Sequence, residues 1–209
     1  MEGIKTVPAV LWVAFAALVF LTLRRALAPQ LDRLSNVKTP VFEMSFAEQL
    51  LDEAAAKTQG GPAPSASERR GAVSRLEHAA ECLAGGRILW VDDNPEWNVS
   101  LVRLFRQLGM AVDTSLSTQE ALTKLEGRSY DLIISDMRRD SEQPPETAGI
   151  TLIEALGQRG VRLPVIIFAV NFDPRLGVHP AIFAYTNFVD DLVQYVIDIM
   201  ERIKFRAAF

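Results

Sequence analysis

Two stretches of the chain end an apolar run in aspartate: ILWVDDNP at residues 88–95 and DLIISDM at residues 131–137. Both runs are short and rich in β-branched and aromatic residues, which is typical of a buried strand. A strand that is apolar throughout fits a parallel sheet covered on both faces. Because ligands of such sheets bind beyond the carboxyl ends of the strands, we expect Asp92, Asp93 and Asp136 to meet at one edge.

Outward from these stretches, strand-like and helix-like segments alternate along residues 86–209. The expected strands are residues 87–91, 111–115, 131–135, 163–170 and 181–185, and the expected amphipathic helices are residues 95–108, 118–125, 150–157 and 189–203. Strict alternation of this kind predicts an α/β fold, a doubly wound five-stranded parallel sheet with helices on both faces.

The chemistry of three neighbouring carboxylates points to a cation site. Such groups repel one another and raise each other's pKa values, so they normally hold a cation. A set of oxygen ligands without His or Cys favours Mg²⁺, and one of the carboxylates can then act as a nucleophile towards a phosphoryl group. Asn94 followed by Pro95 is expected to cap the next helix, which leaves Asp92 and Asp93 free for such a site.

These stretches, together with STQEALTKLEGRSYDLIISDM (117–137) and LPVIIFA (163–169), resemble the receiver domain of two-component response regulators. The resemblance covers about residues 86–205 and implies a flavodoxin-like sheet with strand order 2-1-3-4-5. It implies that a histidine kinase or phosphotransfer protein passes a phosphoryl group to Asp136 in the presence of Mg²⁺.

The metal ligands that the resemblance implies are the acid pair Asp92 and Asp93, Asp136 itself, and the backbone carbonyl of Arg138. The second acid of the pair, Asp93, is the more usual direct ligand in the family. The side chains of Arg138, Arg139 and Asp140 are expected to lie in a solvated loop, with a phosphate clamp as the alternative.

Two positions depart from the family pattern. Ala169 stands where the family has Thr or Ser, and Asn187 is the nearest match to the family's Lys, so both the hydroxyl and the positive charge are missing. The loop at residues 137–148 is longer than usual, and residues 171–180 leave about two turns for the fourth helix. These losses leave open a second function, a phosphorylation-independent pseudo-receiver that acts as a protein-interaction module.

The amino-terminal segment predicts a membrane anchor. Residues 6–23 contain 18 uncharged, mostly apolar residues, which span roughly 27 Å as a helix, close to the thickness of a hydrocarbon core. Arg24 and Arg25 follow it and place the carboxyl side in the cytoplasm. We therefore expect a single-pass anchor (1–25) in the inner (plasma) membrane with a cytoplasmic receiver domain. A signal peptide cleaved near Ala28 and a buried soluble helix are the alternatives.

Between the anchor and the receiver-like domain (86–209), residues 26–85 are expected to form a helical and flexible juxtamembrane linker. Apolar spacing predicts helices at residues 41–57 and 68–83. The Gly/Pro/Ala/Ser-rich residues 58–67 are expected to decouple the domain from the membrane.

Composition excludes several classes of protein. The 209 residues carry a net charge of −4, which argues against a general nucleic-acid binder, and one cysteine cannot form a disulfide framework. No kinase, cyclase or phosphodiesterase motif is present, so we expect no enzyme. A dehalogenase-type hydrolase would need a second acid at Arg138. The output is expected to pass to a downstream protein whose identity is unknown.

Overall fold

The computed structural model describes residues 44–57, 65–169 and 179–207. Five parallel strands form one sheet in the order β2-β1-β3-β4-β5. The strands are β1 (Arg87–Val91), β2 (Ala111–Ser115), β3 (Leu132–Ser135), β4 (Val165–Phe168) and β5 (Ile182–Thr186). The predicted doubly wound, five-stranded sheet with strand order 2-1-3-4-5 is therefore confirmed.

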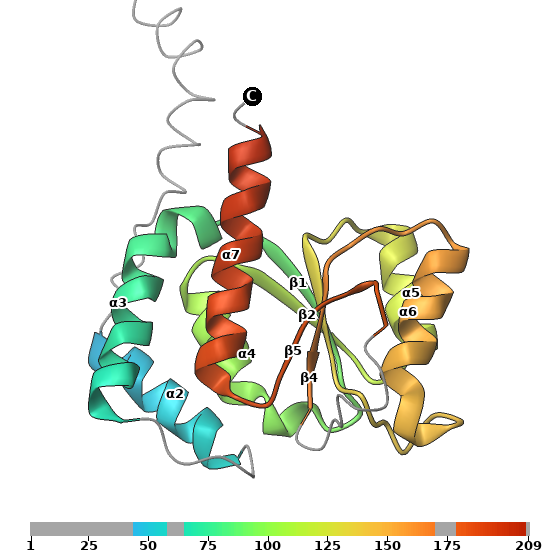
Figure 1. Ribbon diagram of the computed structural model, residues 1–209, viewed down its shortest axis with the longest axis horizontal. Coiled ribbons are helices and arrows are strands. Elements are labelled where there is room, and N and C mark those ends of the chain that lie inside the picture. Colours follow the sequence, from blue (N-terminus) through green and yellow to red (C-terminus); the bar gives the residue numbers. More distant parts are fainter. Residues whose placement is uncertain (1–43, 58–64, 170–178, 208–209) are drawn as a thin grey trace, which may run out of the picture. The chain divides into compact units, whose positions relative to one another are not determined.

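Helices cover both faces of this sheet (Figure 1). One face carries α5 (Thr118–Gly127) and α6 (Ala148–Gln158), the latter preceded by the short turn η2 (Pro145–Thr147). The other carries α4 (Val99–Gln107) and α7 (Val189–Ala207), with the turn η1 (Pro95–Trp97) before α4. The helix predicted at residues 95–108 is thus divided into a 3₁₀ turn and an α-helix.

Alternation along the strands divides the buried side chains between two hydrophobic clusters. In β1, Ile88 and Trp90 belong to the cluster under α4 and α7, whereas Leu89 and Val91 belong to the cluster under α5 and α6. This is the period-two pattern of a strand that is buried on both faces.

Two further helices precede the sheet and pack on the same side as α4 and α7. They are α2 (Met44–Lys57) and α3 (Ala66–Leu83), and Figure 1 shows them beside α7. Leu51 of α2 and Leu76 of α3 are fully buried in the cluster that also holds Ile88. Arg69 of α3 forms an ion pair of 2.6 Å with Asp190 of α7.

Helices α2 and α3 pack against the sheet and its helices, a contact that the sequence pattern did not predict. The domain boundary at residue 86 stays a prediction, and the described residues on both sides of it belong to one compact unit. The physical reason is that the apolar faces of α2 and α3, which the sequence pattern left without a partner, are covered by α4 and α7. Burial of such faces is the main source of helix stability in proteins.

The predicted membrane anchor does not lie in the part of the chain that the structure describes. Across residues 44–57, 65–169 and 179–207, no helix has both the length and the apolar character needed to cross a bilayer. The predicted anchor at residues 6–23 lies outside those ranges, as do residues 26–43 and 58–64 of the predicted linker and residues 171–178 of the segment expected to hold the fourth helix. The anchor and the short fourth helix therefore stay predictions.

Candidate functional site

The three acids meet at one edge of the sheet, as the strand pattern predicts. Asp92 and Asp93 follow β1 and Asp136 follows β3, and Val91 and Ser135 are paired in the ladder that joins these strands. One carboxylate oxygen from each acid lies within 4.8 Å of the others. The carboxyl ends of adjacent parallel strands thus place Asp92, Asp93 and Asp136 around one point.

Asp92 organises the turn that follows β1. Its Oδ1 accepts the backbone N–H of Asn94 at 2.7 Å, and its Oδ2 accepts Nδ2–H of Asn98 at 2.6 Å. Asn94 makes no capping hydrogen bond from its side chain and instead donates to Oδ1 of Asp93 at 2.9 Å. Asn94 therefore occupies the predicted N-cap position with Pro95 after it, but its side chain binds Asp93 and not the backbone of the helix.

The carboxyl groups of the cluster have perturbed pKa values. Burial, followed by the negative charge of Asp92, raises the pKa of Asp136 to about 6, although the N–H groups of Met137 and Arg138 oppose the shift. Burial also raises the pKa of Asp92, and the charge of Asp93 adds to this effect. These shifts, and a donor set made only of oxygens, fit a hard divalent cation such as Mg²⁺.

The acids line a pocket with a volume of about 410 Å³. The apolar side chains of Leu101, Phe168 and Ala169 line the same pocket. Ala169 is buried and its backbone N–H donates to the carbonyl of Thr186 at 3.2 Å, so the position that carries a hydroxyl in the family offers only a methyl group.

The residue matched to the family's Lys does not reach this pocket. Asn187 is not among the described residues that line it. The neighbouring hydroxyl of Thr186 donates to Asp191 at 3.0 Å and accepts the N–H of Phe188 at 2.9 Å, so it serves the start of α7 instead.

Among the residues that the structure describes, two with positively charged side chains line the pocket, Lys57 at the end of α2 and Arg138. Arg138 is exposed and pairs with Asp140 at 2.9 Å and with Glu146 at 3.7 Å, in agreement with a solvated loop. The sequence did not predict that Lys57 belongs to this pocket, because it lies 35 residues before Asp92, in the predicted linker. No local signal connects these two residues.

Arg139, in contrast, is fully buried, which corrects the expectation of a solvated side chain. All five of its N–H groups have acceptors. The acceptors are the hydroxyls of Ser135 (2.7 Å) and Thr118 (2.9 Å), the carbonyls of Asp136 (2.8 Å) and Ala148 (2.7 Å), and Oε1 of Glu142 (2.5 Å). The guanidinium thus fixes the loop after β3 to the starts of α5 and α6.

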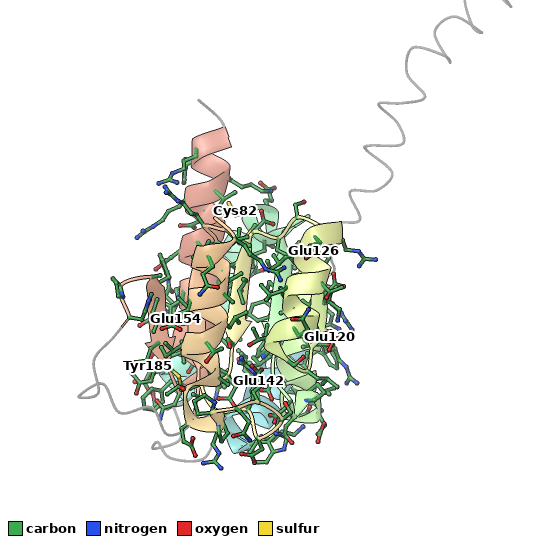
Figure 2. The ribbon with its side chains drawn as sticks, turned by 90° about the vertical axis from the view of Figure 1, so that its right-hand side faces the viewer. Cys82, Glu120, Glu126, Glu142, Glu154 and Tyr185 are labelled. Atoms are coloured by element: carbon green, nitrogen blue, oxygen red, sulfur yellow. The ribbon has the colours of Figure 1, made fainter. Side chains whose placement is uncertain are left out.

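Glu142 completes this buried network. It lies between the amino-terminal ends of α5 and α6 (Figure 2), where its Oε1 also accepts the backbone N–H of Thr118 at 2.9 Å. Although burial raises the pKa of Glu142, the hydrogen bonds and charge of Arg139 and the donors of Thr118 hold it below the ordinary value. Nothing in the local sequence marks this pair, because its partners come from four separate segments.

The region that contains this site is similar to known proteins. Residues 88–182 match the family model described as response regulator receiver domain. Two-component response regulator ARR11 of Arabidopsis thaliana is 35% identical over 98 residues, which cover 46% of this chain and 18% of that protein. The gliding motility regulatory protein of Myxococcus xanthus is 33% identical over 104 residues, 47% of this chain and 13% of that protein.

The matched region is thus less than a fifth of the length of either relative. The receiver domain of Francisella response regulator 1452 has the same fold, with a TM-score of 0.50 and 22% identity over 57% of this chain and 99% of that chain.

Proposed function

We propose that this chain, whose residues 88–182 form a response regulator receiver domain, accepts a phosphoryl group on Asp136. The phosphoryl donor is a histidine kinase or a phosphotransfer protein of a two-component system. One observation carries the proposal: the Asp136 carboxylate opens into a pocket together with Asp92 and Asp93, with ligand oxygens within 4.8 Å of one another. An aspartate held in this way is both accessible and close to a cation site.

In the transfer, a carboxylate oxygen of Asp136 attacks phosphorus, the P–N bond of the donor phosphohistidine breaks and a P–O bond forms. The N–H of Met137 donates to Oδ1 of Asp136 at 2.7 Å and orients the carboxylate. With its pKa raised to about 6, Asp136 is mostly ionised at neutral pH and more basic than an ordinary aspartate.

Mg²⁺, when bound, would neutralise charge that develops on the phosphoryl oxygens. The residues that would hold it are Asp92, Asp93 and Asp136, and the resemblance to the family adds the backbone carbonyl of Arg138. The chain then acts as an acceptor without turnover, and the lack of a second acid at Arg138 supports that assignment over a hydrolase.

The test uses the full chain with acetyl phosphate and Mg²⁺, read by intact mass. We expect the wild type to gain one phosphoryl group and Asp136→Asn to gain none, because the nucleophilic carboxylate is replaced by an amide. Asp140→Asn is the matched control, since Asp140 lines the same pocket but is exposed and follows no strand, and it should still label. Labelling of Asp136→Asn would show that another residue is the acceptor.

The second candidate function is a pseudo-receiver that binds a downstream protein whatever its phosphorylation state. Ala169 favours it, because a buried methyl group cannot hydrogen-bond a phosphoryl oxygen and transmit its presence. Absence of an adduct on the wild type, under conditions that label an ordinary receiver, would select this candidate.

Restoring the hydroxyl is expected to improve the response to phosphorylation. Ala169→Thr should tighten binding of beryllofluoride, a phosphoryl mimic, by about three- to tenfold, since one hydrogen bond contributes roughly 0.5–1.5 kcal/mol. Ala169→Val has the same branched shape without the hydroxyl and should give no gain. Equal affinities for the two variants, measured by titration in Mg²⁺, would place Ala169 outside contact with the phosphoryl group.

For location, residues 6–23 support a single-pass anchor in the inner (plasma) membrane with the receiver domain in the cytoplasm. The positive charges of Arg24 and Arg25 support this orientation. Retention in the membrane fraction after alkaline washing, lost when charges are introduced into residues 6–23, is the expected result.

A further inference from the structure

The pocket that Asp136 lines is also lined by a positively charged residue of α2, a helix that precedes the receiver domain. Lys57 is the last residue of α2, and Ala54, one turn earlier, lines the same pocket. Of the two cations that line it among the described residues, Arg138 is paired with the carboxylates of Asp140 and Glu146. Lys57 Nζ donates instead to a neutral acceptor, the backbone carbonyl of Glu96, at 3.1 Å.

Packing holds α2 in this position. Its apolar face, which includes Leu50 and Leu51, is buried in the main hydrophobic cluster. The Oε2 of Glu53 accepts the hydroxyl of Ser100 in α4 at 3.1 Å, which ties the polar side of α2 to the helix that follows the acid pair. Lys57 is therefore held at the pocket by a helix, while its four-carbon stem leaves the ammonium group free to move.

The negative charge expected at a phosphorylated Asp136 is more than one divalent cation neutralises, and Lys57 is placed to offset part of it. A phosphoryl group on Asp136 would carry about two negative charges beside the carboxylates of Asp92 and Asp93. One divalent cation offsets only about half of that total. In the part of the chain that the structure describes, Lys57 is the pocket-lining cation without a carboxylate within ion-pair distance, so it is available to supply the remainder.

From this geometry we infer that Lys57 exchanges the carbonyl of Glu96 for an oxygen of the phosphoryl group on Asp136. The inference rests on the proposed function, and it makes α2 a part of the phosphorylation site. Because Lys57 ends α2, formation of the new ion pair would alter the contact between α2 and the turn at Glu96. The state of Asp136 would then be read by a helix outside the family-matched residues 88–182.

The test titrates the full chain with beryllofluoride in saturating Mg²⁺, and separately with Mg²⁺ alone. Intrinsic tryptophan fluorescence, to which the pocket-lining Trp97 contributes, is the signal in both titrations. Lys57→Gln should weaken beryllofluoride binding about tenfold, the order of one charge-assisted hydrogen bond at a partly exposed site. Binding of Mg²⁺ alone should stay the same or tighten, because the variant removes a positive charge next to three carboxylates.

Two controls separate charge from structure. Lys57→Arg keeps the charge and should bind beryllofluoride within about twofold of the wild type, whereas Arg70→Gln removes one charge from the exposed face of α3 and should change neither titration. Equal loss of both affinities in Lys57→Gln would indicate a merely structural role and overturn the inference.

Wild-type affinity for beryllofluoride in Lys57→Gln would also overturn it and leave the proposed function intact. A wild-type chain that takes neither beryllofluoride nor a phosphoryl group would overturn the proposed function and, with it, this inference.

Discussion

Replacing Arg139 by methionine is expected to destabilise the folded chain by about 3–5 kcal/mol, the usual result when one partner of a buried ion pair is removed. The guanidinium is fully buried, and the carboxylate of Glu142 that it contacts at 2.5 Å is only 14% exposed. Methionine fills a similar volume but donates no hydrogen bond. The hydroxyls of Ser135 and Thr118 and the carbonyl of Ala148 would lose a donor as well.

Urea unfolding followed by circular dichroism measures this change. Arg138→Met is the matched control, because the neighbouring side chain is 60% exposed and its surface ion pairs contribute about 0–1 kcal/mol. Adding Glu142→Gln to the Arg139→Met variant should recover part of the loss, since it removes the unpaired buried charge. Equal stabilities for the variants at residues 138 and 139 would refute the role assigned to the buried network.

The sheet and the acid cluster were predictable because each depends on local pattern. Strand period and apolar content indicated β1 and β3, and parallel topology alone then places Asp92, Asp93 and Asp136 at one edge. Ala169 and its missing hydroxyl were identified in a different way, from the resemblance to the receiver family, in which a Thr or Ser follows the fourth strand.

The features that were not predicted depend on partners far away in the chain. A charged side chain is almost never fully buried unless it is paired, so the burial of Arg139 could not be inferred before Glu142 and its other acceptors were placed around it. Lys57 likewise gains its position from the packing of α2 against α4, and the amphipathic pattern of a helix does not say which surface will cover it.

Asp136→Asn is expected to stabilise the metal-free chain by about 2 kcal/mol at pH 8 and to have little effect at pH 4. Burial raises the pKa of Asp136 to about 6 from an ordinary value of 3.8. For a fully buried group, this shift corresponds to a change of about 3 kcal/mol in the free energy of unfolding. The change is smaller for Asp136, which is only partly buried. The folded chain therefore binds this proton more tightly than the unfolded chain does.

The stability that this proton contributes is fully present below about pH 4 and is lost as the pH rises through about 6. Asparagine stays neutral throughout, so the two unfolding free energies should separate across that window. Mg²⁺ should reverse the order, because a cation stabilises the ionised cluster of the wild type more than it stabilises the variant.

Asp113→Asn is a control for which the expected change in the free energy of unfolding has the opposite sign. Although burial raises the pKa of Asp113, the hydrogen bonds from Tyr130 at 2.8 Å and from Arg128 at 3.2 Å hold it below the ordinary value. Its ionised form is favoured in the folded chain, so this variant should lose stability at pH 8 relative to the wild type. Urea unfolding in EDTA at pH 4 and pH 8 separates the two cases. A wild-type chain as stable as Asp136→Asn at pH 8 would show that neither burial nor the charge of Asp92 disfavours the ionised form of Asp136 in the folded chain.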